Sequence, residues 1–292
     1  MDLNGDGFKD ILSGSYSGKN VGAARMAGLF QVFWGTKDGF NKAQTLNGSD
    51  GKPLIIGSEA DWSDKNLTER ICTRPTAVDW DNDGKLDLVT GTFTGSFYLF
   101  KGEGAGVFSP RSEQILADGK PLEVKYHSDP MVVDWDGDGD LDVVSGCAGG
   151  SVMLAENSGS RAQPSLKPFV ELIKHVSREE TATAAEQLSG PSDNVRVWVG
   201  DINGDGKLDV LVGDSVMLSA PAAGLTAEQM KARERQWQEQ YQELIKKHHI
   251  ENKGASEEAA RKLNEQISKM HEARSEFVRE TNTGFVWLYL QK

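Results

Sequence analysis

The sequence is poor in cysteine and in long apolar runs, and it carries more acid than base. Two cysteines in 292 residues exclude a disulfide-dense scaffold. No run approaches the roughly 18 apolar residues that a membrane-spanning helix needs. The 32 Lys and Arg face 44 Asp and Glu, a net charge of −12, which argues against a nucleic-acid-binding protein because such proteins carry a basic surface. No signal peptide is visible, since an acidic segment follows Met1 directly.

Much of the acid lies in one nine-residue pattern, Asp-x-(Asp/Asn)-x-Asp-Gly-x-x-Asp. The pattern occurs in four copies, which begin at Asp2, Asp79, Asp134 and Asp201. Four copies of a pattern this long are not expected by chance, so the chain contains internal repeats. Like charges this close together repel strongly unless a cation lies between them.

The spacing of the carboxylates predicts a calcium site in each copy. Side chains at positions 1, 3 and 5 of a tight loop converge on one point, and the glycine at position 6 permits the sharp turn. A backbone carbonyl at position 7 and the aspartate at position 9 complete an all-oxygen cage of the kind that Ca²⁺ prefers, whereas Mg²⁺ keeps its waters and prefers fewer carboxylates. We therefore expect up to four Ca²⁺ ions, with these ligands: Asp2, Asn4, Asp6, Asp10, Asp79, Asp81, Asp83, Asp87, Asp134, Asp136, Asp138, Asp142, Asp201, Asn203, Asp205 and Asp209.

The residues around the loops indicate strands rather than helices. Apolar β-like runs follow the loops directly, as in Leu88-Val-Thr and Val143-Val-Ser, and similar runs precede three of them. An EF-hand has helices on both sides and closes with glutamate at position 12, so it fits poorly. The first copy has no room for a strand before its loop.

A loop of this type between two strands resembles the FG-GAP/VCBS repeat, which is found in β-propellers such as integrin α heads and many secreted bacterial proteins. The resemblance covers all four copies and implies an all-β fold, a β-propeller of four to five recognisable blades with calcium loops between strands. It also implies a secreted, periplasmic or cell-surface protein, since extracellular calcium is millimolar and suits such sites. It does not imply an activity, because the fold serves many roles.

The organisation along the chain follows from the same repeats and one interruption. Residues 1–224 are predicted to form the propeller, with units near 1–45, 74–117, 129–175 and 195–218. Residues 225–280 have helical spacing with a break near Gly254, which predicts an inserted α-helical hairpin whose apolar spacing is that of a coiled coil. Residues 281–292 predict a final propeller strand.

A second face of the propeller is expected opposite the calcium loops. If the loops join first and second strands, the other ends of those strands lie together, and we expect a protein or glycan partner there. This set is Ser15, Cys72, Thr92, His127, Cys147, Asn194 and Asp214. A disulfide between Cys72 and Cys147 is left open.

Three functions remain compatible with the sequence. The first is a non-enzymatic, calcium-binding module or scaffold for a protein or glycan partner. The second is a carbohydrate-active enzyme, because some polysaccharide lyases resemble this fold, although no catalytic constellation is visible from spacing. The third is a lectin-like glycan binder, which would show similar residues at matching blade positions.

Overall fold

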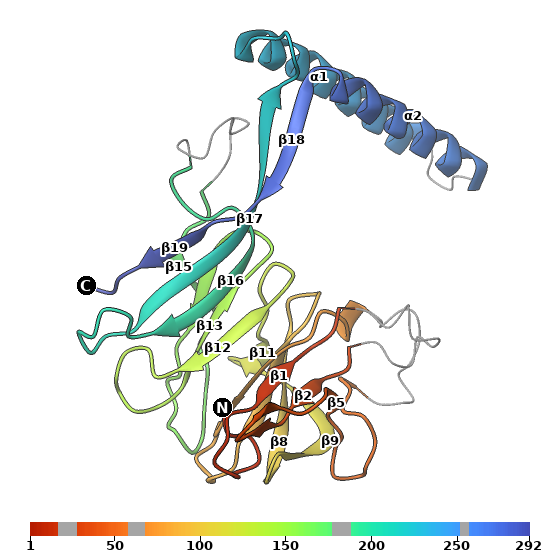
Figure 1. Ribbon diagram of the computed structural model, residues 1–292. Helices are drawn as coiled ribbons and strands as arrows, with labels where there is room; N and C mark the ends of the chain where they lie inside the picture. Colours follow the sequence, from red (N-terminus) through yellow and green to blue (C-terminus); the bar gives the residue numbers. More distant parts are fainter. Residues whose placement is uncertain (17–27, 58–67, 177–187, 252–256) are drawn as a thin grey trace. The chain divides into compact units, whose positions relative to one another are not determined.

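A computed structural model describes residues 1–16, 28–57, 68–176, 188–251 and 257–292 (Figure 1). The chain divides into two compact units. The first, Met1–Val176 with Gly190–Ser215 and Gly284–Lys292, contains four blade-like sheets arranged as a β-propeller. The second, Ser177–Ser189 with Val216–Thr283, contains both helices. The all-β propeller fold and the inserted helices are thus as expected from the sequence.

Blades two and three are complete four-stranded antiparallel sheets. Blade two contains β6 (Arg74–Val78), β7 (Asp87–Gly91), β8 (Phe97–Gly104) and β9 (Val107–Gln114). Blade three contains β12 (Asp129–Val133), β13 (Asp142–Gly146), β14 (Val152–Ala155) and β15 (Val170–Ile173). In both blades the acidic loop joins the first strand to the second.

Blade one begins at the equivalent of a second strand. Its sheet has the order β1 (Ile11–Ser13), β2 (Gln31–Phe33) and β5 (Gln44–Thr45). Two short hairpins lie beside blades one and two: β3 (Gly35–Thr36) with β4 (Gly39–Phe40), and β10 (Leu116–Ala117) with β11 (Lys120–Pro121). The expectation that the first unit lacks the strand before its loop is confirmed for the described residues.

Blade four is completed by a segment that returns after a long insertion. β16 (Asp193–Gly200) pairs with β17 (Asp209–Pro221), and Val210–Gly213 of β17 pair with β19 (Val286–Tyr289). β19 therefore takes the place of a third strand. The final propeller strand was predicted at residues 281–292, but it begins only at Val286, because residues 281–283 belong to a different strand, β18 (Val278–Thr283).

The second unit is a two-stranded ribbon and a helical hairpin. The distal part of β17 pairs with β18 (Val278–Thr283), and between them run α1 (Ala227–Glu251) and α2 (Glu257–Ser275). The prediction of helix as far as residue 280 is wrong at its end, because α2 stops at Ser275 and residues 278–283 form a strand. Met230, Phe277 and Val278 form a small core of their own with Leu225 and Trp237.

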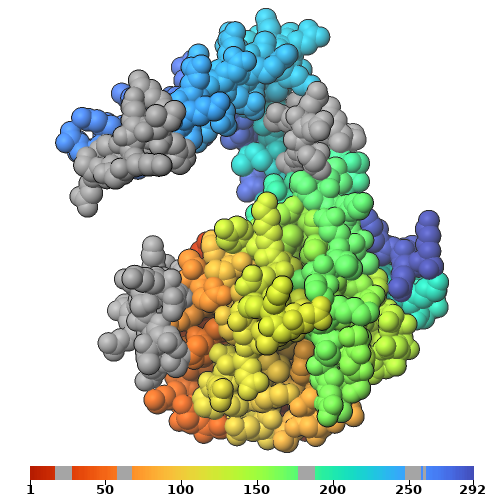
Figure 2. Space-filling model, turned by 180° about the vertical axis from the view of Figure 1, so that it is seen from behind, coloured from red at the N-terminus to blue at the C-terminus, as the bar shows by residue number. Residues whose placement is uncertain are grey.

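Three apolar cores lie between successive blades. The second strand of each blade supplies neighbouring apolar residues that point to opposite faces. In β7, Leu88 packs into the core shared with blade one, whereas Val89 packs into the core shared with blade three. In β13, Val143 and Val144 divide in the same way between blades two and four. Figure 2 shows the first three blades side by side, in orange, yellow and green.

Glycines allow consecutive blades to approach at their backbones. Gly14, Gly91 and Gly146 each end a second strand or follow it directly. A Cβ on them would lie 1.9 Å from the carbonyl oxygen of Thr73, 2.2 Å from that of Ser128 and 2.4 Å from that of Val195. Each of these carbonyls belongs to the next blade, so a side chain at any of the three positions would push two blades apart.

Two further observations complete the comparison with the sequence. Cys72 and Cys147 are both buried and free, so they do not form a disulfide. Within the described residues, none of the helices has the length and apolar character needed to cross a membrane.

Candidate metal centres

The four acidic loops are held in one shape by hydrogen bonds from their own backbone. The aspartate at position 1 accepts the N–H of position 6 in every loop, at 2.8 Å for Asp2, 3.1 Å for Asp79 and 3.0 Å for Asp134 and Asp201. The glycine at position 6 has a positive φ in all four loops, between 84° and 97°, which glycine adopts without strain. The sequence pattern therefore encodes a turn that is closed by hydrogen bonds within the loop itself.

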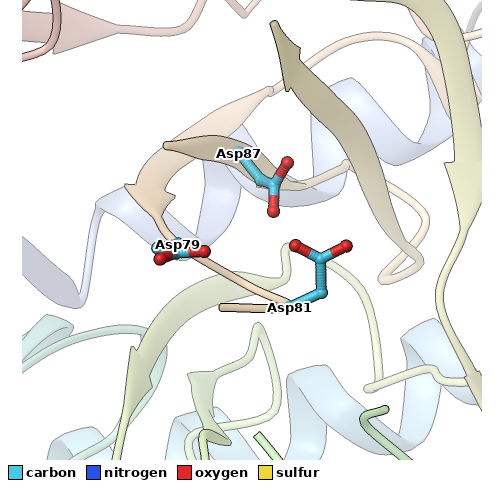
Figure 3. A group of neighbouring side chains, drawn as sticks. All are labelled: Asp79, Asp81 and Asp87. Carbon is cyan, nitrogen blue, oxygen red and sulfur yellow. The ribbon is translucent and has the colours of Figure 1, made fainter. Parts of the chain in front are cut away.

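In two loops the carboxylates converge closely enough to share one cation. Oxygens of Asp79, Asp81 and Asp87 lie within 4.8 Å of one another (Figure 3), and those of Asp134, Asp136 and Asp138 do the same. Ligand oxygens on Ca²⁺ lie about 2.3–2.6 Å from the ion, so two of them are at most about 5 Å apart. Both groups therefore fit a calcium ion.

Two buried oxygens without partners support this fit. Oδ1 of Asp81 and Oδ1 of Asp140 are buried and accept no hydrogen bond from the described residues. Burial raises the pKa of Asp140, and the carboxylates of Asp138, Asp142 and their neighbours raise it further. A buried carboxylate crowded by others is stabilised when a cation enters.

Loops one and four share a variant of this arrangement. In loop one, Asn4 donates through Nδ2 to Oδ2 of Asp6 at 3.0 Å and accepts the N–H of Asp6 at 3.0 Å. In loop four, Asn203 and Asp205 make the same pair of contacts at 3.0 and 2.9 Å. The hydrogen bond from the backbone N–H of Lys207, and next the one from the Asn203 side chain, lower the pKa of Asp205, so this carboxylate is readily ionised for a cation.

The aspartate at position 9 has a structural role that spacing could not reveal. Asp10, Asp87, Asp142 and Asp209 are at most 5 % exposed. One oxygen of each accepts the N–H of loop position 2, at 2.7–3.0 Å. The other oxygen accepts an N–H at or just beyond a third strand, from Gly35, Gly102, Asn157 or Gln291, at 2.7–3.1 Å. These aspartates tie the loop to the blade, and their role as metal ligands stays a prediction.

In loop two the positively charged side chain of Lys101 lies beside the carboxylates. Nζ of Lys101 lies 2.7 Å from Oδ2 of Asp81 and 3.6 Å from Oδ2 of Asp87. The corresponding residues of the other blades are Trp34, Glu156 and Leu290, none of them a base. Sequence reasoning missed Lys101, although its position one residue before Gly102 was a usable signal once the third strands were aligned.

The strand ends opposite the loops also come together, as expected, but as contacts between blades. Cys72, His127 and Asn194 stand seven residues before their loops, and all have positive φ, at 60°, 52° and 51°. Their N–H groups donate to the preceding blade, to the carbonyls of Tyr16, Phe93 and Ala148. Much of the polar backbone on this face is therefore already used between blades.

Comparison with known proteins agrees with the repeats. Residues 79–145 match a family model described as FG-GAP-like repeat. The match covers the second and third loops and the blade between them. No curated protein sequence matches the chain.

Proposed function

We propose that this chain is a calcium-stabilised β-propeller that acts outside the cytoplasm as a non-enzymatic binding or scaffold module. The observation that carries the proposal is the convergence of carboxylates in loops that the backbone has already shaped. A preformed all-oxygen site with exposed entry suits weak to moderate calcium binding, which is filled at extracellular calcium concentrations and largely empty at cytosolic ones.

In blades two, three and four the calcium ions would hold the first and second strands together at one end of the blade. Each ion binds the folded loop and has no comparable site in the unfolded chain, so it stabilises the fold by mass action. The opposite strand ends would then be free to meet a protein or glycan partner.

Calcium titration of metal-stripped protein tests the first part of the proposal. We expect up to four Ca²⁺ bound by calorimetry, and a rise in melting temperature that excess chelator reverses. Mg²⁺ at the same concentration should give a much smaller rise, because it keeps its waters. Equal melting with and without calcium would contradict the proposal.

A binding screen tests the second part. Calcium-loaded protein is applied to arrays of acidic and neutral glycans, beside a variant with Asn194→Asp on the face opposite the loops and a variant with Asp38→Asn on an exposed turn of blade one. Binding weakened by the first change and not by the second would support a partner on that face.

A further inference from the structure

One face of blade four is built like a blade–blade interface, but none of the described blades packs against it. Trp198 of β16, Leu211 of β17 and Leu288 of β19 are cross-strand neighbours and lie on one face. None of them belongs to the core between blades three and four. We define the free face as these three residues and the adjacent row of Arg196, Gly213 and Val286.

The equivalent residues of the other blades are buried. Val286 corresponds to Phe97 in blade two and Val152 in blade three, two residues after the glycine that precedes each third strand. Phe97 and Val152 are 0 % exposed, whereas Val286 is 74 % exposed. Leu288 is 49 % exposed, whereas its equivalents Leu99 and Leu154 are 7 % and 5 % exposed. The free face thus has apolar side chains at positions that the other blades bury under the next blade.

Gly213 repeats the glycine of the blade junctions without its contact. It occupies the position of Gly14, Gly91 and Gly146, which lie against a carbonyl of the next blade. A Cβ on Gly213 would meet no atom within 4 Å. The backbone is shaped for a close approach that no described residue of the chain makes.

Arg196 indicates the charge of the partner. It stands five residues before its loop, as Arg74 and Asp129 do in blades two and three. Arg74 of blade two faces Asp129 of blade three, with 3.7 Å between Nε and Oδ1. Arg196 donates from Nη1 to the carbonyl of Val195, its own neighbour. Burial and the nearby Arg74 lower its pKa, and the charge of Asp129 in blade three offsets this only in part. An acidic group on the next blade would pair with Arg196 as Asp129 pairs with Arg74.

We propose that the free face binds a further propeller blade of the same repeat type. The first strand of that blade places a backbone carbonyl on Gly213 and, one residue later, a carboxylate on Arg196. Blade one does not cover the free face in the described structure, since Val286 is 74 % exposed and a Cβ on Gly213 would meet no atom within 4 Å. The proposal does not depend on calcium binding or on a partner at the opposite strand ends.

A fusion tests the proposal directly. The full chain is joined at its C-terminus to a second copy of residues 125–176, the blade whose first strand already meets Gly91 and Arg74. A flexible linker of about 20 residues spans roughly 25 Å. The reporter for the free face is a cysteine introduced by Val286→Cys in the original chain. The native Cys72 and Cys147 are buried and should not react, and Cys147 of the added copy is replaced by Ser. We expect labelling of this cysteine by a maleimide to be at least ten times slower in the fusion than in the unfused chain.

Two controls make the result specific. Gly213→Val in the fusion should restore fast labelling by blocking the approach, and in the unfused chain it should leave the melting temperature unchanged. A cysteine at Val170, which is 58 % exposed on β15, should react equally fast with and without the added blade. Equal labelling of residue 286 in fused and unfused chains, or no effect of Gly213→Val, would overturn the proposal. Slow labelling of an unfused chain that has the mass of a dimer would overturn it in favour of a second copy.

Discussion

The aspartates of one loop differ in their surroundings, and mutation should separate their roles. Asp142 is 1 % exposed and accepts two backbone N–H groups, at 2.9 and 2.7 Å. Asp136 is exposed and accepts one N–H within its loop. Asp142 should therefore stabilise the blade with or without metal, whereas Asp136 should contribute to stability only when a metal is bound.

We expect Asp142→Asn to destabilise the protein even in the presence of chelator. The amide removes the charge from two hydrogen bonds, each worth about 1.5–3 kcal/mol, so a loss of about 2–4 kcal/mol is expected in urea unfolding. Asp136→Asn should leave the chelated protein within about 0.5 kcal/mol of the parent and reduce only the stabilisation by calcium. A chelated Asp142→Asn protein as stable as the parent would contradict the structural role.

Lys101 should compete with calcium at loop two. Lys101→Met removes a positive charge close to Asp81 and Asp87, so calcium should bind there more tightly, by about tenfold for roughly 1.4 kcal/mol of relieved repulsion. The chelated protein should melt lower than the parent, because the carboxylates lose their partner.

Calorimetric titration measures the affinity, and Lys262→Met serves as a control. Lys262 pairs with Glu258 at 2.9 Å on an exposed helix surface of the second unit, so its loss should change neither the calcium affinity nor the melting temperature of the propeller appreciably. Unchanged calcium affinity in Lys101→Met would contradict the competition.

At the scale of elements, the sequence predicted those loops, strands and helices that are determined by residues close together in the chain. The loops, the strands beside them and the two helices follow from spacing and residue type within short segments. β18 was missed because Arg279-Glu-Thr-Asn-Thr283 is polar and exposed, and it becomes a strand only by pairing with distant β17. The tie from Asp142 to Asn157 also joins residues that no local pattern connects.

The helical hairpin is held at its base by a buried ion pair. Nε of Arg274 lies 2.9 and 3.0 Å from the two oxygens of Glu234, and its guanidinium lies 5.3 Å from the centre of the Trp237 ring. The Arg274 side chain is 14 % exposed and that of Glu234 is 10 % exposed. Arg274 also pairs with Glu280, so removing Arg274 rather than Glu234 is what would leave a buried charge, that of Glu234, without this partner.

Arg274→Met should therefore destabilise the hairpin by about 3 kcal/mol. The expected readout is a lower midpoint of the helical circular dichroism signal at 222 nm. Lys262→Met is the control, because its pair with Glu258 is exposed and such pairs contribute little. Identical midpoints for the two variants would show that the ion pair does not hold the helices.

At the scale of the whole molecule, we expect calcium to stabilise the propeller unit and not the helical unit, because the helical unit has a core of its own. All four acidic loops belong to the propeller unit, whereas Met230, Phe277 and Val278 form the core of the helical unit. Units with their own cores need not unfold in one step. We expect two transitions, one seen in the near-ultraviolet signal of the propeller tryptophans and one in the helical signal.

Chelator should then move one transition far more than the other. If each of four sites binds with a dissociation constant near 0.1 mM, 2 mM calcium stabilises the propeller by about 7 kcal/mol in total. For a unit of this size that corresponds to a shift of roughly 15–30 °C. The helical transition should shift by a few degrees at most, and Arg274→Met should lower that transition alone. If chelator lowered both transitions equally, the hairpin would depend on the propeller for its stability, with β17, which runs through both units, as one of the segments that couple them.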